Sequence, residues 1–177
     1  MLRVSQLAVR LGQAAGLRAS ELQCLRRSAR IHDIGKVAVP RRLIDKVGPL
    51  RPHEFAIVRE HTVIGEEIAR GVGAPGDVAR AIRHHHERWD GTGYPDGLAG
   101  HAIPVLSRII AIADAYDAMI HDRPYRLRLS KKAALAELIR CAGTQFDPEM
   151  TELFIRRVLG TAPVSQDDSL ALAGGSK

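Results

Sequence analysis

Aromatic residues, cysteines and long apolar runs are all scarce in this sequence, and each shortage narrows what the chain can be. Aromatic residues make up 4% of the 177 residues although the apolar fraction is 45%, so much of the apolar content is aliphatic. This balance favours helices packed on helices over a β-sheet. No apolar run approaches the roughly 18 residues that a membrane-spanning helix needs, so we expect no membrane span.

The two cysteines, Cys24 and Cys141, lie far apart and form no Cys-x-x-Cys motif. They predict reduced, packed thiols and a cytoplasmic protein rather than a disulfide framework. The formal net charge is +6, and a basic balance favours anionic partners. Because the arginines are scattered, charge alone does not distinguish a phosphate-bearing small molecule from nucleic acid or a membrane surface.

Apolar residues recur at three- and four-residue steps along most of the chain, which predicts an all-α fold, a single bundle of about seven helices. The first helix ends near Gly16. A Ser-x-x-Gln capping pattern at Ser20 starts the second, whose inner face continues through His32 to Lys36. The third begins at Pro52 and continues past His61. The later helices are predicted to begin at Asp77, Pro104, Ser130 and Asp147.

Composition changes near the C-terminus. Residues 161–177 are rich in Ser, Ala, Gly and Asp, which predicts a flexible, disordered tail. We therefore expect one helical domain over residues 1–160 followed by this tail.

Polar side chains interrupt the apolar faces of several predicted helices. The second, third and fourth each place a histidine there, and the fifth adds two aspartates. A lone inward histidine is usually a satisfied core residue, but burying several unpaired imidazoles and carboxylates is costly unless something binds them. A metal centre does so, and helical bundles commonly build one from inward-facing side chains. The inward residues are His32, His61, His85, Asp114 and Asp117.

The candidate ligands combine imidazole with carboxylate and include no thiolate, which suits Fe, Mn, Zn or Ni and excludes a zinc–sulfur structural site. Neighbours such as His32 and Asp33 point about 100° apart on a helix, so they suit two metals with a bridging carboxylate. Two metals about 3.5–4 Å apart serve phosphoryl chemistry, in which a bridging hydroxide attacks phosphorus in line. His84 and His86 flank His85 symmetrically, and helix geometry does not separate them. The candidate set is His32, Asp33, His61, His85, one of His84 and His86, and Asp114.

Five ordered segments resemble the HD-GYP branch of the HD phosphohydrolase superfamily, over roughly residues 1–160. They are RIHDIGKVAVP (30–40), HHERWDGTGYPDGL (85–98), SRIIAIADAYDAM (107–119), RPYR (123–126) and GTQFDPEM (143–150). The resemblance implies an all-helical fold, a centre of two or three metals that usually contains iron or manganese, and hydrolysis of cyclic di-GMP to the linear dinucleotide pGpG and often GMP. Some members of this branch prefer cyclic GMP–AMP.

The resemblance also implies roles for individual residues. It assigns the six candidate ligands, with His86 rather than His84, to the metals. Asp33 and Lys36 are then catalytic, Asp33 as the bridging ligand and Lys36 as the cation that holds a non-bridging phosphate oxygen. Arg126 stands where many relatives have lysine, which keeps the charge but changes its geometry. The residues assigned to the substrate are Gly93, Tyr94, Pro95, Asp117, Arg123 and Arg126.

Relatives with three metals carry a glutamate and a histidine on the first helix, and neither has a counterpart after Met1. We therefore expect two metals and a first helix that is truncated at its start. The implied partners are cyclic di-GMP, a diguanylate cyclase (GGDEF) domain or an upstream receiver or sensor domain, with no nucleic acid polymer and no membrane, and a homodimer is compatible. Two alternatives stay open, a dinucleotide receptor without turnover and a broader HD nucleotidase.

Overall fold

The computed structural model describes residues 1–122 and 127–160, and within these ranges the chain forms helices and no strand. The predicted all-helical fold is confirmed. The α-helices outnumber the expected seven because a short α3 forms and the third predicted helix is divided into α4 and α5. The predicted tail (161–177) lies outside the described residues. The helices are α1 (Leu2–Ala14), α2 (Ala19–Ile31), α3 (Arg41–Ile44), α4 (Pro52–Arg59), α5 (His61–Gly71), α6 (Gly76–Arg83), α7 (Val105–Ile120), α8 (Lys131–Cys141) and α9 (Pro148–Leu153).

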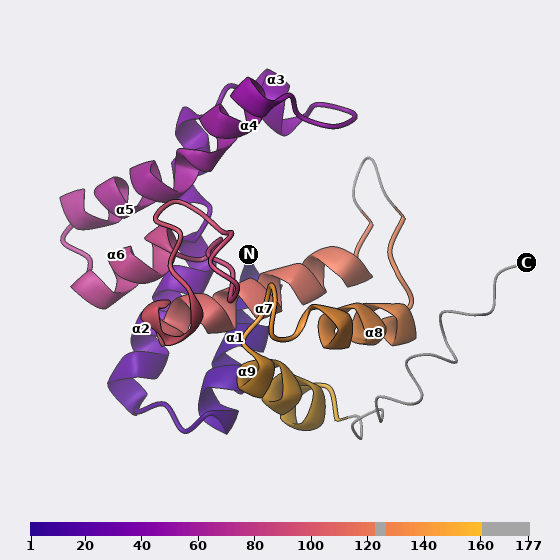
Figure 1. Cartoon of the computed structure of the whole chain (residues 1–177). Helices are drawn as coiled ribbons and strands as arrows, with labels where there is room; N and C mark the ends of the chain where they lie inside the picture. Colours follow the sequence, from indigo (N-terminus) through magenta and orange to yellow (C-terminus); the bar gives the residue numbers. More distant parts are fainter. Residues whose placement is uncertain (123–126, 161–177) are drawn as a thin grey trace, which may run out of the picture.

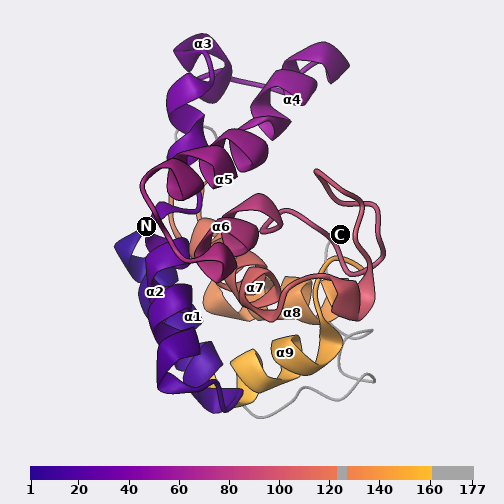
Figure 2. The same cartoon turned by 90° about the vertical axis from the view of Figure 1, so that its left-hand side faces the viewer.

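The main apolar core lies between α1, α2, α7, α8 and α9, which form the lower part of the molecule in Figures 1 and 2. Its largest fully buried side chains include Leu11, Leu25, Ile109 and Phe154. Burial of each such side chain contributes roughly 1.5–3 kcal/mol. A smaller apolar cluster, which includes Val78 and Ile82, joins α5 to α6. These two cores fix the relative positions of the helices that carry the predicted ligands.

Two predicted helix starts are confirmed by their capping hydrogen bonds. The Ser130 hydroxyl accepts the backbone N–H of Ala133 at 3.1 Å and opens α8. The Asp147 carboxylate accepts the backbone N–H groups of Glu149 and Met150 at 2.9 and 3.1 Å and opens α9. Both side chains satisfy N–H groups that a helix leaves without partners at its first turn.

Two other predicted caps are wrong. The second helix starts at Ala19, and the Glu21 carboxylate accepts the backbone N–H of Arg18 at 2.9 Å, so Ser20 lies inside the first turn. Asp77 lies in the first turn of α6, after the cap residue Pro75, and forms an ion pair with Arg80. In both helices an acidic residue in the first turn interacts favourably with the helix dipole.

Three predicted helices also end earlier than the apolar pattern indicates. The second helix ends at Ile31, and a separate 3₁₀ helix, η1 (Ile34–Ala38), carries Lys36. The third is interrupted at Glu60, between α4 and α5. The helix before the triple histidine ends at Arg83. Each break lies within two residues of a predicted metal ligand.

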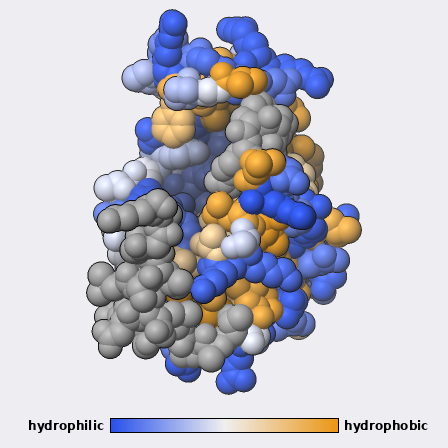
Figure 3. All heavy atoms as spheres, turned by 90° about the vertical axis from the view of Figure 1, so that its right-hand side faces the viewer, coloured by the Kyte–Doolittle hydropathy of each residue, from blue (hydrophilic) through white to orange (hydrophobic). Residues whose placement is uncertain are grey.

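Helices α3 and α4 project away from the main core, at the top of Figures 1 and 2. Consistent with this position, α4 has no buried residue. Figure 3 shows a hollow lined by hydrophilic side chains beneath this upper part of the molecule. Within the described ranges, no helix combines the length and the apolar character that crossing a membrane requires.

Candidate metal centre

Three histidines follow the C-terminal ends of three helices, and their rings take part in ending those helices. His32 comes directly after the end of α2. His61 follows the end of α4 after one intervening residue and begins α5, and His85 follows the end of α6 after one intervening residue. In each ring Nδ1 lies within hydrogen-bonding distance of the carbonyl three residues earlier, at 3.0, 2.6 and 2.6 Å respectively. A carbonyl can only accept, so Nδ1 carries the proton and Nε2 keeps its lone pair. Each ring thereby donates a hydrogen bond to a carbonyl in the last turn of its helix, where backbone partners are scarce.

The free Nε2 atoms point to a common centre. Among the described residues, the buried side-chain atoms without a hydrogen-bond partner are Nε2 of His32, His61 and His85 and Oδ1 of Asp33. Leaving four buried polar atoms unsatisfied is costly, and such groups are rare in folded proteins. All four are atoms that can donate a lone pair to a cation. The donor set therefore fits a metal centre by its chemistry.

Asp33 lies in the middle of the cluster. Its Oδ1 is 3.5 Å from Nε2 of His61 and 3.9 Å from Nε2 of His85. Its Oδ2 is 3.6 Å from Nε2 of His32 and receives a 2.7 Å hydrogen bond from Nζ of Lys36. One carboxylate thus faces histidines from three helix ends, which is the arrangement that a bridging ligand needs.

Asp114 joins the cluster from α7 through His32, because its Oδ1 lies 3.6 Å from Nε2 of that histidine. Potential ligand atoms of Asp33, His61, His85 and His86 lie within 4.8 Å of one another, a group that omits His32 and Asp114. The six predicted ligands are therefore arranged as a compact group of four with a His32–Asp114 pair beside Asp33. This layout has room for more than one metal.

The triple histidine divides between two sites. His86 lies with the cluster, its ring centroid 4.1 Å from that of His85 and 5.1 Å from that of His61. His84 turns away, because its Nδ1 faces the Arg80 carbonyl at 2.9 Å and its Nε2 faces Oδ2 of Asp96 at 2.8 Å. Both nitrogens of His84 are occupied, so the geometry favours His86 as the ligand.

Most pKa values in the cluster are shifted in directions that suit a bound cation. The exception is His32, where burial opposes the charged form but the carboxylates of Asp114 and Asp33 raise the pKa above its usual value. Burial, reinforced by the neighbouring histidines, lowers the pKa of His85 well below its usual range and the pKa of His86 to about 3. Burial also lowers the pKa of His61. Burial opposes ionisation of Asp33, but His32 and Lys36 outweigh it and lower the pKa of that carboxyl group. Neutral imidazole and ionised carboxylate are the forms that bind metals.

Three histidines of the cluster are buried, whereas its carboxylates and lysine are partly exposed to solvent. The side chains of His61 and His85 are each 1% exposed, whereas those of Asp33, Asp114 and Lys36 are 18, 30 and 38% exposed. Solvent and ligands therefore reach the cluster from the side of the carboxylates and the lysine.

Gly35 allows the HD segment to pack directly on α5. A Cβ atom at Gly35 would lie 2.0 Å from the carbonyl oxygen of His61 and 2.6 Å from the backbone nitrogen of Gly65. No side chain fits in this space, so glycine is required for the close approach. The contact sets the distance between Asp33 and His61.

Tyr94 covers the cluster from the Gly-rich loop. Its ring centroid lies 5.0 Å from that of His86 and 6.4 Å from that of His61. Gly93 has a packing role, because a Cβ there would lie 2.3 Å from the backbone nitrogen of Arg88. The predicted substrate contact of the Gly93–Tyr94–Pro95 triplet is thus centred on the Tyr94 ring, which is the side chain that reaches the histidines.

Sequence reasoning missed Glu87, which organises this loop. Glu87 is 4% exposed, and its carboxylate accepts the backbone N–H groups of Asp96 and Leu98 at 2.8 and 3.1 Å. The signal available in the sequence was an acidic residue directly after the predicted ligands. Arg83 reinforces the same loop through two hydrogen bonds, both 2.7 Å, to the Asp96 carboxylate.

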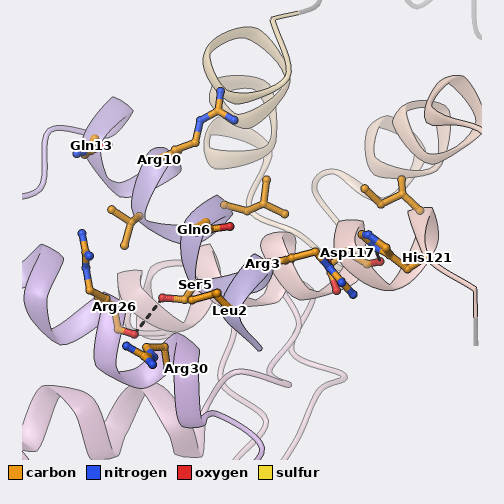
Figure 4. A pocket seen from close by; sticks show the side chains of 13 residues that line it. Leu2, Arg3, Ser5, Gln6, Arg10, Gln13, Arg26, Arg30, Asp117 and His121 are labelled. Atoms are coloured by element: carbon orange, nitrogen blue, oxygen red, sulfur yellow. Dashed lines mark hydrogen bonds and ion pairs between the residues drawn. The ribbon is translucent and has the colours of Figure 1, made fainter.

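Asp117 does not join the histidine cluster. Its Oδ1 accepts a hydrogen bond from Nε of Arg3 at 2.9 Å and lies 3.2 Å from Nδ1 of His121. These residues line a separate pocket along α1, shown in Figure 4, whose other arginines point apart instead of converging. The predicted substrate contacts of Arg123 and Arg126 lie outside the described residues.

Comparisons with known proteins agree with this geometry. A family model described as "HD domain" matches residues 2–150. The "Cyclic di-GMP phosphodiesterase response regulator RpfG" of Xanthomonas campestris is 39% identical, covering 87% of this chain and 41% of that protein. The "3'3'-cGAMP-specific phosphodiesterase 2" of Vibrio cholerae is 38% identical, covering 86% of this chain and 30% of that protein.

The solved structures agree on the fold. Bd1817, described as an HDG"Y"P protein from Bdellovibrio bacteriovorus, superposes with a TM-score of 0.72 at 23% identity, covering 90% of this chain and 51% of that one. At this identity the likeness shows the fold alone. The chain spans 41% of the length of the Xanthomonas relative and 30% of the length of the Vibrio relative.

Proposed function

The chain belongs to the HD domain family, in line with its resemblance to the HD-GYP branch, and on this basis we propose that it is a metal-dependent phosphodiesterase acting on cyclic di-GMP. The observation that carries the proposal is the convergence of four buried lone-pair atoms, without partners among the described residues, beside a lysine. We infer that the products are pGpG, GMP or both.

Divalent metals fit the donor set, and iron or manganese suits imidazole combined with carboxylate. Two metals would be held by the six residues of the cluster, with Asp33 between them. When bound, such metals act as Lewis acids toward phosphate oxygens and activate water for attack on phosphorus. A third metal has no further ligands in the cluster. The metal ligands are His32, Asp33, His61, His85, His86 and Asp114.

Residues of the chain supply orientation and charge. The helix-end carbonyls fix the tautomers of His32, His61 and His85, so each ring presents Nε2 without rearrangement. Lys36 donates to Asp33 with one N–H and keeps two for a non-bridging phosphate oxygen. Its positive charge would stabilise the negative charge that develops on the phosphate in the transition state.

Substrate binding rests on the open side of the cluster. Tyr94 presents an aromatic ring beside the cluster that a base can border. Arg123 and Arg126 are proposed to contact the phosphates, as the resemblance implies. Asp117 would have to leave Arg3 and His121 to contact a base, so its role in binding includes the loss of that ion pair.

A cyclic GMP–AMP phosphodiesterase is a second candidate, because the Vibrio cholerae relative is named as specific for 3'3'-cGAMP. We also propose regulation by a receiver or sensor domain in the same polypeptide or by a cyclase domain, since the Xanthomonas relative is named a response regulator. Cytoplasmic localisation stays a prediction based on the two free cysteines.

The test is a single preparation assayed for metal and turnover. The chain is purified without oxygen, its metals are counted, and cyclic di-GMP and cyclic GMP–AMP are each incubated with it after addition of Mn or Fe. We expect about two metals per chain and conversion of at least one dinucleotide to linear product. Dinucleotide binding with little metal and no product would contradict the enzyme and favour a receptor.

A further inference from the structure

Arg59, in the last turn of α4, lies next to the loop that covers the cluster. Its guanidinium carbon is 4.6 Å from the ring centroid of Tyr94 and 5.8 Å from that of Phe55. The rings of Phe55 and Tyr94 meet edge to face with centroids 5.8 Å apart. We refer to Phe55, Arg59 and Tyr94 together as the Arg59 wall.

Among the described residues, the guanidinium of Arg59 has no hydrogen-bond acceptor. No carboxylate within the described ranges forms an ion pair with it, although arginines elsewhere on the surface, such as Arg70 and Arg83, are paired. A guanidinium over a ring uses its face for the cation–π contact, so its N–H donors in the plane stay available. Phe55 beside it is 42% exposed, so its ring is accessible to a ligand.

The position of the Arg59 wall relative to the cluster determines which part of a bound dinucleotide it contacts. Tyr94 lies between Arg59 and His86, so Arg59 is one aromatic ring further from the cluster than the ligands themselves. The Tyr94 ring therefore separates Arg59 from a phosphate that reacts at the cluster. A base attached to that nucleotide extends away from the phosphate and is the group that would reach the wall.

We propose that Arg59 is a specificity-determining residue that donates two hydrogen bonds to O6 and N7 of a guanine base, while Tyr94 holds the guanidinium in place and the exposed ring of Phe55 contacts the base. Guanine presents two acceptors on this edge, which match the fork of an arginine, whereas adenine presents a donor in place of O6. The Arg59 wall would therefore favour guanine over adenine. This inference rests on the proposed function of the cluster.

The experiment compares Arg59→Gln and Arg59→Lys with the unaltered chain, with metal content measured in each preparation. Arg51→Gln is the matched control, because Arg51 precedes the same helix and is exposed. The KM for cyclic di-GMP and the inhibition constant of cyclic di-AMP, which has no guanine, are measured for each. The lysine variant keeps the charge without the fork, so it separates base reading from general attraction.

Both Arg59 variants should raise the KM for cyclic di-GMP about tenfold to a hundredfold, with kcat, metal content and the cyclic di-AMP constant nearly unchanged. Arg51→Gln should change none of these values. An equal loss for both dinucleotides, or a loss in kcat alone, would overturn the base contact and leave Arg59 as a support for Tyr94. Unchanged kinetics would overturn it as well. If the unaltered chain binds metal but cleaves no dinucleotide, the proposed function fails first and the inference with it.

Discussion

At the scale of single residues, the cluster is explained by which nitrogen of each histidine is free. His32, His61 and His85 donate Nδ1–H to a helix-end carbonyl and leave Nε2 bare, whereas His84 has partners at both nitrogens. Two adjacent histidines of identical chemistry thus acquire different tasks. His84 supports the Gly-rich loop through Asp96, and His86 faces the cluster.

Alanine substitutions of His84 and His86 should therefore have different consequences. His86→Ala removes a proposed ligand, so the metal content per chain and the turnover rate should both fall. His84→Ala leaves the cluster intact and removes a contact to Asp96, so metal content should stay while the KM for cyclic di-GMP rises. Metal analysis and steady-state kinetics on both variants distinguish the two tasks. Loss of metal in His84→Ala with full metal in His86→Ala would reverse the assignment.

At the scale of elements, the sequence predicted which helices exist better than it predicted where they end. Apolar periodicity and the caps at Ser130 and Asp147 gave the correct helices. The apolar stripe, however, continues through His32 to Lys36 and through Val58 to Gly65, and periodicity cannot reveal that a histidine side chain replaces the next backbone hydrogen bond. The ends were therefore missed at the positions where the cluster forms.

The site was predicted at the level of residue types and spacing, and less well in its geometry. The resemblance and the inward polar residues together indicated six candidate ligands, and the fold brings these residues together. The ion pair of Asp117 with Arg3 depends on how α1 packs against α7, and neither local spacing nor composition carries that information. The same holds for Glu87, whose partners are backbone groups of a loop that only tertiary structure brings close.

A substitution that adds one methyl group at Gly35 tests the contact between η1 and α5. Gly35→Ala would place a Cβ 2.0 Å from the His61 carbonyl oxygen, so η1 must move and take Asp33 with it. We expect a lower melting temperature, reduced metal content and loss of turnover. Gly71→Ala is the control, because a Cβ there meets nothing within 4 Å. Normal metal content in a folded Gly35→Ala protein would contradict the role given to this contact.

At the scale of the whole molecule, the last helix is tied to the centre of the bundle by a buried ion pair. Nη1 of Arg108 on α7 lies 2.5 Å from Oδ2 of Asp147, and the two side chains are 12 and 0% exposed. Asp147 also caps α9, so one carboxylate links the start of that helix to α7. The segment around Asp147 in turn holds the loop, because the backbone N–H groups of Trp89 and Asp90 donate to the carbonyls of Gln145 and Thr144.

Removal of this carboxylate should weaken the whole fold. Asp147→Ala leaves the Arg108 charge buried without its partner, so the free energy of unfolding should fall by about 3–5 kcal/mol. Asp77→Ala removes an exposed ion pair with Arg80 and should cost no more than about 1 kcal/mol. Urea unfolding of both variants gives the comparison. An equal loss of unfolding free energy in both variants would show that the buried ion pair stabilises the fold no more than the exposed one.

We propose that the buried atoms around Asp33 form a metal centre that hydrolyses a cyclic dinucleotide. The most direct test measures metal per chain and cyclic di-GMP turnover in the same preparations of the unaltered chain, Asp33→Asn and the control Asp45→Asn, whose carboxylate is exposed and paired with Arg41. Asn keeps the shape of Asp33 but removes the charge that two cations would share. We expect that Asp33→Asn alone loses both metal and turnover. Full metal content with an unchanged rate in Asp33→Asn would contradict the proposed metal centre.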